Sequence, residues 1–127
     1  MDRRTVRVVR ADQLLILPDG QTAGMTREEA VSADGLWVGM VRTAPGMVSG
    51  WHHHGDYDTY AFVASGRGRI EFGEGGQEMV EATTGDFLHV PSRVIHRESN
   101  PAGDESVIVL FRVGSGEPVF NVSGPDG

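Results

Sequence analysis

Two glycine-framed segments near the middle of the chain decide its fold: GMVSGWHHHGDYDTYAFVASG at residues 46–66 and GDFLHVPSRVIHRESN at residues 85–100. In an extended strand, successive side chains point to opposite faces, so His52 and His54 project from the same side, about 6.6 Å apart at roughly 3.3 Å per residue. Two imidazoles placed in this way can converge on one metal ion. His96, in the second segment, can supply a third ligand if strand pairing brings the two segments together.

The spacing within these segments resembles the two motifs of the cupin superfamily. Those motifs are Gly-x5-His-x-His-x3,4-Glu-x6-Gly and Gly-x5-Pro-x-Gly-x2-His-x3-Asn, and both fit at nearly every fixed position. Arg93 replaces the inner glycine of the second motif, and no glutamate stands at the carboxylate position of the first. The resemblance implies an all-β fold, a double-stranded β-helix or jelly-roll barrel, in a small single-domain protein of the monocupin, conserved-barrel kind.

Short extended segments separated by eighteen glycines and six prolines agree with an antiparallel sandwich or barrel. Only residues 26–33, TREEAVSA, have helix chemistry, with Thr26 as a candidate N-cap and two glutamates in the first turn. We expect one cupin domain over residues 1–127 with its core at about 36–113, an N-terminal strand arm and a polar C-terminal tail. The expected strands are 6–9, 13–17, 36–43, 48–54, 59–65, 68–73, 78–82, 86–90, 94–99, 106–113 and 118–122.

The amino-acid composition limits which molecules the protein is expected to bind and where in the cell it is expected to be. The formal net charge is −7 and the eleven basic residues are scattered arginines, so we expect no nucleic-acid partner. Lysine and cysteine are absent, which excludes Schiff-base chemistry, disulfides and thiolate ligands. The basic start is not followed by a long apolar region, so we expect a cytoplasmic protein without a membrane segment or export signal. The expected partner is a small-molecule substrate or ligand, and the resemblance to cupins also implies a homodimer.

The missing glutamate leaves the fourth ligand position open. Counting forward from His54 gives Asp58, whereas counting back from the closing glycine gives Thr59, and neighbours on a strand face opposite ways. With Thr59 the site has three histidines only, because a neutral hydroxyl is a feeble ligand; with Asp58 it has three histidines and a carboxylate. Tyr60 and Phe62 share the parity of Asp58, and large aromatic side chains prefer burial, which favours an inward Asp58.

Other polar residues near the motifs have candidate roles. Glu98 shares the parity of His96 and is expected either to point into the cavity as a catalytic acid or base, or to pair with an arginine at a sheet edge. Tyr60 is a second catalytic candidate, as a donor to a bound oxyanion, unless it is a core residue. Arg42 is a candidate anchor for a substrate carboxylate or a surface residue at a strand end. His89 is expected to be a cavity or surface residue, not a ligand.

The expected cofactor is a divalent transition metal, with iron(II) favoured and zinc, manganese or nickel as alternatives, because imidazole ligands alone do not separate these metals. The resemblance implies a metal-dependent small-molecule enzyme. Our preferred hypothesis is a non-haem iron(II) dioxygenase-like oxidoreductase acting on a chelating anionic substrate. Two alternatives stay open: a metal-containing binding or sensor module without turnover, and a non-oxidative isomerase, decarboxylase or cyclase.

Overall fold

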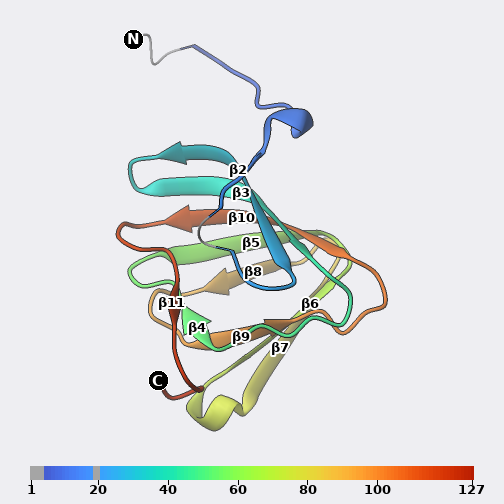
Figure 1. The fold of residues 1–127 in the computed structure, drawn as a ribbon, viewed down its shortest axis with the longest axis vertical. Coiled ribbons are helices and arrows are strands. Elements are labelled where there is room, and N and C mark those ends of the chain that lie inside the picture. The colour runs from blue at the N-terminus through green and yellow to red at the C-terminus, as the bar shows by residue number, and fades with distance from the viewer. Residues whose placement is uncertain (1–4, 19–20) are drawn as a thin grey trace.

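A computed structural model describes residues 5–18 and 21–127 and shows two antiparallel β-sheets that face each other (Figure 1). The first sheet has six strands in the order β1-β2-β3-β10-β5-β8, and the second has five in the order β11-β4-β9-β6-β7. The strands are Leu15–Ile16 (β1), Met25–Ala33 (β2), Leu36–Thr43 (β3), His52–His53 (β4), Asp58–Ser65 (β5), Arg67–Phe72 (β6), Glu78–Thr83 (β7), Phe87–Val90 (β8), His96–Ser99 (β9), Ser106–Val113 (β10) and Phe120–Asn121 (β11). The predicted jelly-roll architecture is confirmed.

The space between the sheets is filled from alternate positions of the strands. In β5, Thr59, Ala61 and Val63 are buried, whereas the residues between them are more exposed. This period of two is what a strand with one inward face requires. The apolar core is a cluster in which strands from the six-stranded sheet meet the loop after β3; its buried members are Met25, Val41, Met47, Ala61 and Leu110.

The expected helix at residues 26–33 is wrong, because this segment forms β2 and pairs with β3 along its length. Its carboxylates act across the sheet and not at a helix N-terminus. Glu28 forms an ion pair with Arg42 at 2.6 Å, and Glu29 accepts a hydrogen bond from the Trp37 indole at 2.8 Å. Pairing with a neighbouring strand outweighs local helix propensity, which is a weak determinant by itself.

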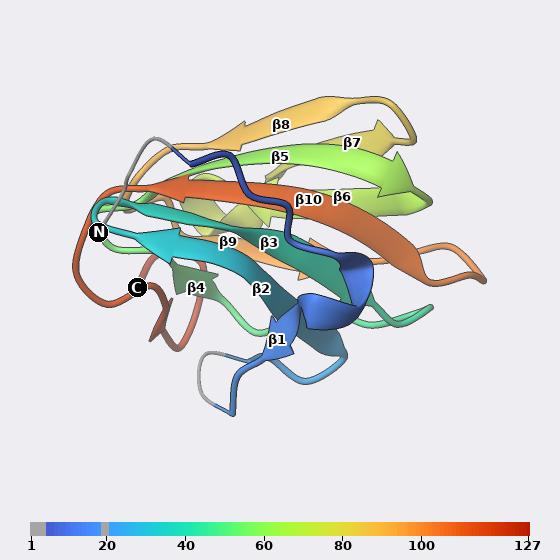
Figure 2. The same ribbon diagram turned by 90° about the horizontal axis from the view of Figure 1, so that it is seen from above.

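The first and last strands lie in different sheets: β1 is at the edge of the six-stranded sheet, and β11 is at the edge of the five-stranded sheet (Figures 1 and 2). Residues 1–4 of the expected N-terminal arm lie outside the described residues, and residues 6–9 form no strand; Val6 is 94% exposed. The C-terminal segment is more ordered than a simple tail, because β11 pairs with β4 beside the histidines. No helix within residues 5–18 and 21–127 is long and apolar enough to cross a membrane.

Candidate metal centre

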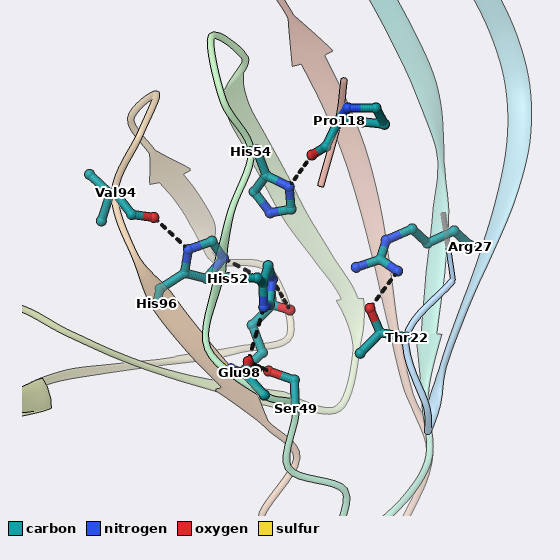
Figure 3. Close-up of polar contacts among 10 residues, drawn as sticks. Thr22, Arg27, Ser49, His52, His54, Val94, His96, Glu98 and Pro118 are labelled. Carbon is teal, nitrogen blue, oxygen red and sulfur yellow. Dashed lines mark hydrogen bonds and ion pairs between the residues drawn. The ribbon is translucent and has the colours of Figure 1, made fainter. Parts of the chain in front are cut away.

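Three histidines and a glutamate meet on the inner face of the five-stranded sheet (Figure 3). His52 in β4 and His96 in β9 are directly opposite each other in an antiparallel pair. His54 follows the end of β4, and Glu98 lies two residues beyond His96 on the same face of β9. One ligand atom from each of the four side chains lies within 4.8 Å of the other three. The structure therefore brings together the three histidines whose spacing predicts a shared site.

Main-chain oxygens fix the orientation of all three imidazoles. In each ring Nδ1 donates to a carbonyl oxygen: His52 to Gly50 (3.0 Å), His54 to Pro118 (2.7 Å) and His96 to Val94 (2.9 Å). Because a carbonyl oxygen only accepts hydrogen bonds, Nδ1 carries a proton, which leaves Nε2 as the atom that can offer a lone pair to a metal. Metal-binding histidines use this arrangement, in which the second nitrogen is held by an outer partner.

Three of the atoms that face one another across the cluster form no hydrogen bond with the described residues. Nε2 of His52, Nε2 of His96 and Oε2 of Glu98 are buried and have no hydrogen-bond partner within the described part of the chain. Both imidazole Nε2 atoms lie 3.5 Å from a Glu98 carboxylate oxygen. Two ligands bound to one ion at about 2.0–2.2 Å lie at most about 4.4 Å apart, so the four-residue cluster needs only small rotations to hold a transition metal.

Charge couples Glu98 to the two imidazoles that it faces. Burial by itself raises the pKa of a carboxyl group, but the contacts with His52 and His96 outweigh it and lower the pKa of Glu98 well below its ordinary value. Burial opposes charge on His96 too, yet the neighbouring Glu98 carboxylate raises the pKa of His96 overall. Glu98 is therefore ionised at neutral pH, as a carboxylate ligand must be.

The structure does not bring Asp58 or Tyr60 to this cluster. The expectation that Asp58, Tyr60 and Phe62 point inward is wrong, because Thr59 and Ala61 occupy the inner face of β5. Asp58 instead accepts a hydrogen bond from the Ser92 amide at 3.2 Å and lies 3.3 Å from His89. Tyr60 is 44% exposed and stacks on His89 with ring centroids 4.7 Å apart. Neither a ligand role for Asp58 nor a catalytic role for Tyr60 agrees with these positions.

Of the other candidate site residues, Glu98 points into the barrel, whereas His89 and Arg42 lie on its outer surface. Glu98 points into the cavity, as its parity with His96 predicts, but it sits among the ligand atoms and not behind them. His89 is on the exposed surface of β8. Arg42 also faces outward, where it pairs with Glu28 at 2.6 Å and is not available as a substrate anchor.

Sequence reasoning missed two arginines inside the barrel. Arg27 in β2 is 5% exposed and Arg112 in β10 is 4% exposed. The alternation of side chains along β10 indicates that Arg112 points inward, because Arg112 shares a face with Leu110 and Ser106, which are both buried. Because arginine usually lies at the surface, an inward direction for these two residues was not expected.

A cavity between the sheets connects the cluster to these arginines. It has a volume of about 50 Å³, and its wall includes His54 and Glu98 on one side and Thr59, Arg27 and Arg112 on the other. A second hollow of about 120 Å³ shares both arginines as wall residues and also includes Trp37, Tyr57 and Pro118. A larger hollow of about 580 Å³ between β7 and β8 has mainly apolar walls and reaches His96.

Removing His54 is expected to reduce the acid sensitivity of the metal-free protein. Burial, together with the charges of Arg112 and His96, lowers the pKa of His54 to about 3. An unfolded histidine titrates near pH 6.5, so below that pH the unfolded state binds a proton that the folded state excludes until about pH 3. The free energy of unfolding should therefore decrease as the pH is lowered through this window, with His54 contributing up to about 1.4 kcal/mol per pH unit.

Urea unfolding of chelator-treated wild type and His54→Gln at a series of pH values measures this contribution. We expect the free energy of unfolding of the variant to change less between about pH 6.5 and pH 4. Equal pH slopes in the two proteins would show that His54 is not held neutral by its surroundings.

Solved structures with the same fold cover nearly the whole chain. A conserved protein with a double-stranded β-helix domain from Klebsiella pneumoniae has a TM-score of 0.72 and 15% identity, and the match covers 94% of this chain and 99% of that one. The polyketide cyclase RemF from Streptomyces resistomycificus has a TM-score of 0.75 and 15% identity, with 93% and 86% covered. Oxalate decarboxylase from Bacillus subtilis, a protein with Mn(II) centres, has a TM-score of 0.67 and 18% identity, with 80% of this chain and 28% of that chain covered.

No curated protein matches the chain by sequence. At these low identities the structural matches show the fold alone. The family model of the cupin domain matches residues 39–114, which is more than half of the 127-residue chain and includes both histidine motifs. The chain therefore belongs to the cupin domain family.

Proposed function

We propose that this protein is a metal-dependent enzyme acting on a small, chelating anionic substrate, and that its metal is held by His52, His54, His96 and Glu98. The observation that carries the proposal is the convergence of buried ligand atoms that have no partner among the described residues. More than nine in ten buried polar groups are hydrogen-bonded in folded proteins, so several unsatisfied atoms facing one point are unusual. One divalent cation satisfies all of them together.

The donor set fits a divalent transition metal. Three neutral imidazoles and one carboxylate suit iron(II), manganese(II), nickel(II) and zinc(II). The Glu98 carboxylate reduces the charge of the occupied site from +2 to +1, which lowers the cost of placing the ion between two sheets. Bound there, a redox-active ion such as iron(II) supplies dioxygen activation, and any of these ions supplies Lewis acidity.

The residues of the chain support such chemistry by orientation and electrostatics. Hydrogen bonds to Gly50, Pro118 and Val94 hold the imidazoles in place before a metal arrives. Arg27 and Arg112 in the wall of the cavity beside the cluster attract an anion. An anionic substrate is therefore drawn to the side of the metal that faces the six-stranded sheet.

The reaction that we place first is oxidation of the chelated substrate by dioxygen at an iron(II) centre. The imidazole-rich donor set beside a small cavity of about 50 Å³ supports this assignment, because it suits iron(II) and leaves room for only a small substrate. A second candidate is a non-oxidative reaction, such as decarboxylation or cyclisation, at manganese(II). Glu98 favours this candidate because it adds a carboxylate oxygen to the donor set, and manganese prefers oxygen ligands more than the later metals do. The fold shared with oxalate decarboxylase and RemF also supports it.

Elemental analysis and oxygen uptake test the proposal on untagged protein loaded with each of the four metals in turn. We expect about one ion per chain in wild type and in His89→Ala, whose histidine is exposed, and a loss of at least tenfold in His96→Ala. Oxygen consumption by the iron form with a diketone, phenolic or thiol substrate supports the first reaction. Turnover by the manganese form without oxygen consumption supports the second, and wild type that holds no stoichiometric metal under any loading condition contradicts both.

A further inference from the structure

Arg112 is a buried cation that forms no ion pair with the described residues. Arg112 is 4% exposed, and its Nε is buried. Its guanidinium group makes no hydrogen bond or ion pair with the part of the chain that the structure describes. Guanidinium groups carry five N–H donors and are almost never fully buried unless paired. Burial lowers the pKa of Arg112 to about 10, with the charge of Arg27 adding to the effect, which still leaves it charged at neutral pH. A site of this kind is incomplete without an anion.

The position of Arg112 is fixed by packing on its apolar side. Its guanidinium carbon lies 5.2 Å from the centre of the Trp37 ring, in a cation–π contact. Glu29, which lines the hollow of about 120 Å³ together with Arg112, accepts a hydrogen bond from the Trp37 indole N–H at 2.8 Å and so holds the indole. Trp37 therefore orients the guanidinium without neutralising its charge.

Thr59 offers a second donor at the same place. It is the direct cross-strand partner of Arg112 in the β5–β10 pair, it is 5% exposed, and its Oγ1 has no hydrogen-bond partner within the described residues. Both residues line the cavity that also includes His54 and Glu98. A hydroxyl and a guanidinium, both lacking acceptors, thus face the metal centre from the opposite sheet.

The charge of the cavity selects an anion. Arg27 lies in the same wall, and Figure 3 shows it extending from the six-stranded sheet toward the histidines. The cavity wall also includes Arg69, which forms an ion pair with Glu81 at 2.9 Å. The one carboxylate that the described residues place in the wall is Glu98, whose contacts are with two of the clustered histidines. A cavity of about 50 Å³ has room for a few water-sized groups, since about 10–15 Å³ is enough for one water. The expected ligand is therefore small.

We propose that Arg112 and Thr59 bind the carboxylate of a short carboxylic acid that carries a second oxygen donor on the adjacent carbon, with that second donor directed at the His52–His54–His96–Glu98 cluster. The contact between the second oxygen donor and the metal rests on the proposed function. The contacts of the carboxylate with Arg112 and Thr59 do not, because they involve no metal. A planar carboxylate matches the fork of the guanidinium, and the threonine hydroxyl can donate to either oxygen. Arg112 and Thr59 thereby determine which end of the substrate faces the metal.

Calorimetric titration with glycolate tests this assignment, with the uncharged analogue glycolamide and inorganic phosphate as comparison probes. Wild type, Arg112→Met, Thr59→Val and the surface control Arg93→Met are each titrated with and without metal. We expect Arg112→Met to raise the Kd for glycolate at least tenfold and Thr59→Val to raise it several-fold, with Arg93→Met unchanged. Wild type and Arg93→Met should both bind glycolamide at least tenfold more weakly than glycolate, whereas Arg112→Met should bind the two probes about equally.

A stability measurement separates a binding role from a structural one. Arg112→Met removes a buried charge that forms no ion pair with the described residues, so the midpoint of thermal unfolding of the metal-free protein should stay the same or rise. A lower midpoint together with unchanged glycolate affinity would identify Arg112 as a structural residue and overturn the proposal. Thr59→Val, which keeps the shape of the side chain, provides the same affinity test if Arg112→Met does not fold.

The two proposals fail in different ways. Glycolate binding that depends on Arg112 in metal-free protein supports the carboxylate site even if wild type never holds a metal, and in that case only the proposed enzyme function is lost. Normal metal content in Arg112→Met with wild-type glycolate affinity overturns the carboxylate site and leaves the metal centre intact. Tighter binding of phosphate than of glycolate to wild type overturns the assignment to a carboxylate.

Discussion

Replacing Glu98 with glutamine is expected to weaken metal binding by roughly 100-fold or more, whereas Asp58→Asn should leave it unchanged. Glutamine keeps the shape of Glu98 but offers a neutral oxygen, so the ion would retain its full +2 charge between the two sheets. The Glu98 carboxylate oxygens lie 3.5 Å from His52 Nε2 and from His96 Nε2, which places the lost charge at the centre of the cluster. Competition with a coloured chelator for zinc(II) or manganese(II) measures the change.

Asp58→Asn is the matched control because Asp58 is the carboxylate that strand counting assigns to the metal. In the structure its oxygen is held by the Ser92 amide at 3.2 Å, away from the histidines. Equal losses in both variants would point to a general disturbance of the fold. A loss in Asp58→Asn alone would restore the ligand set that counting from His54 predicts.

The histidines could be placed from sequence because strand geometry leaves little choice. Side chains two residues apart on a strand share a face, which joins His52 to His54 and His96 to Glu98. Only the pairing of β4 with β9 had to be supplied by the fold, and the cupin motifs implied it. For the same reason the inward direction of Glu98 followed from that of His96.

The fourth ligand could not be placed in this way, because aromatic residues misled the choice of face on β5. Large aromatic side chains usually prefer the core, yet Tyr60 stacks on His89 and Phe62 packs against Phe87 on the outer surface. The inner face of β5 carries the small residues Thr59 and Ala61, which line the cavity. Where a barrel keeps room for a ligand, the bulky residues of a strand move to its outer face, and size no longer indicates burial.

The buried arginines were missed for a related reason. Charged residues usually lie at the surface when stability alone decides, so residue type alone gave no reason to assign a role to Arg27 or Arg112. The burial of Arg112, which forms no ion pair with the described residues, is explained by a bound anion, since an unpaired buried guanidinium destabilises the fold. Conflict between strand parity and residue type at Arg112 is thus itself a signal of a functional site.

Gly39→Ala is expected to destabilise the protein by about 2–3 kcal/mol, because the inner face of β3 has no room for a methyl group beside Trp37. A Cβ at Gly39 would collide with the carbonyl oxygen of Glu28 and with the Trp37 indole. The carbonyl belongs to the neighbouring strand and cannot rotate away, so either the β2–β3 pair separates or the indole shifts. Gly103→Ala is the control, since a Cβ there meets nothing within 4 Å, and it should change stability by less than about 0.5 kcal/mol.

The same substitution also tests how the six-stranded sheet prepares the cavity. Because Trp37 holds the Arg112 guanidinium at 5.2 Å, a displaced indole should weaken glycolate binding even at temperatures where Gly39→Ala is fully folded. Urea unfolding gives the stability change, and calorimetry on the folded variant gives the affinity. Lower stability with unchanged glycolate affinity would mean that the indole keeps its place and that β2 moves instead. Loss of both would show that the absence of a side chain at Gly39 positions the arginine as well as stabilising the sheet.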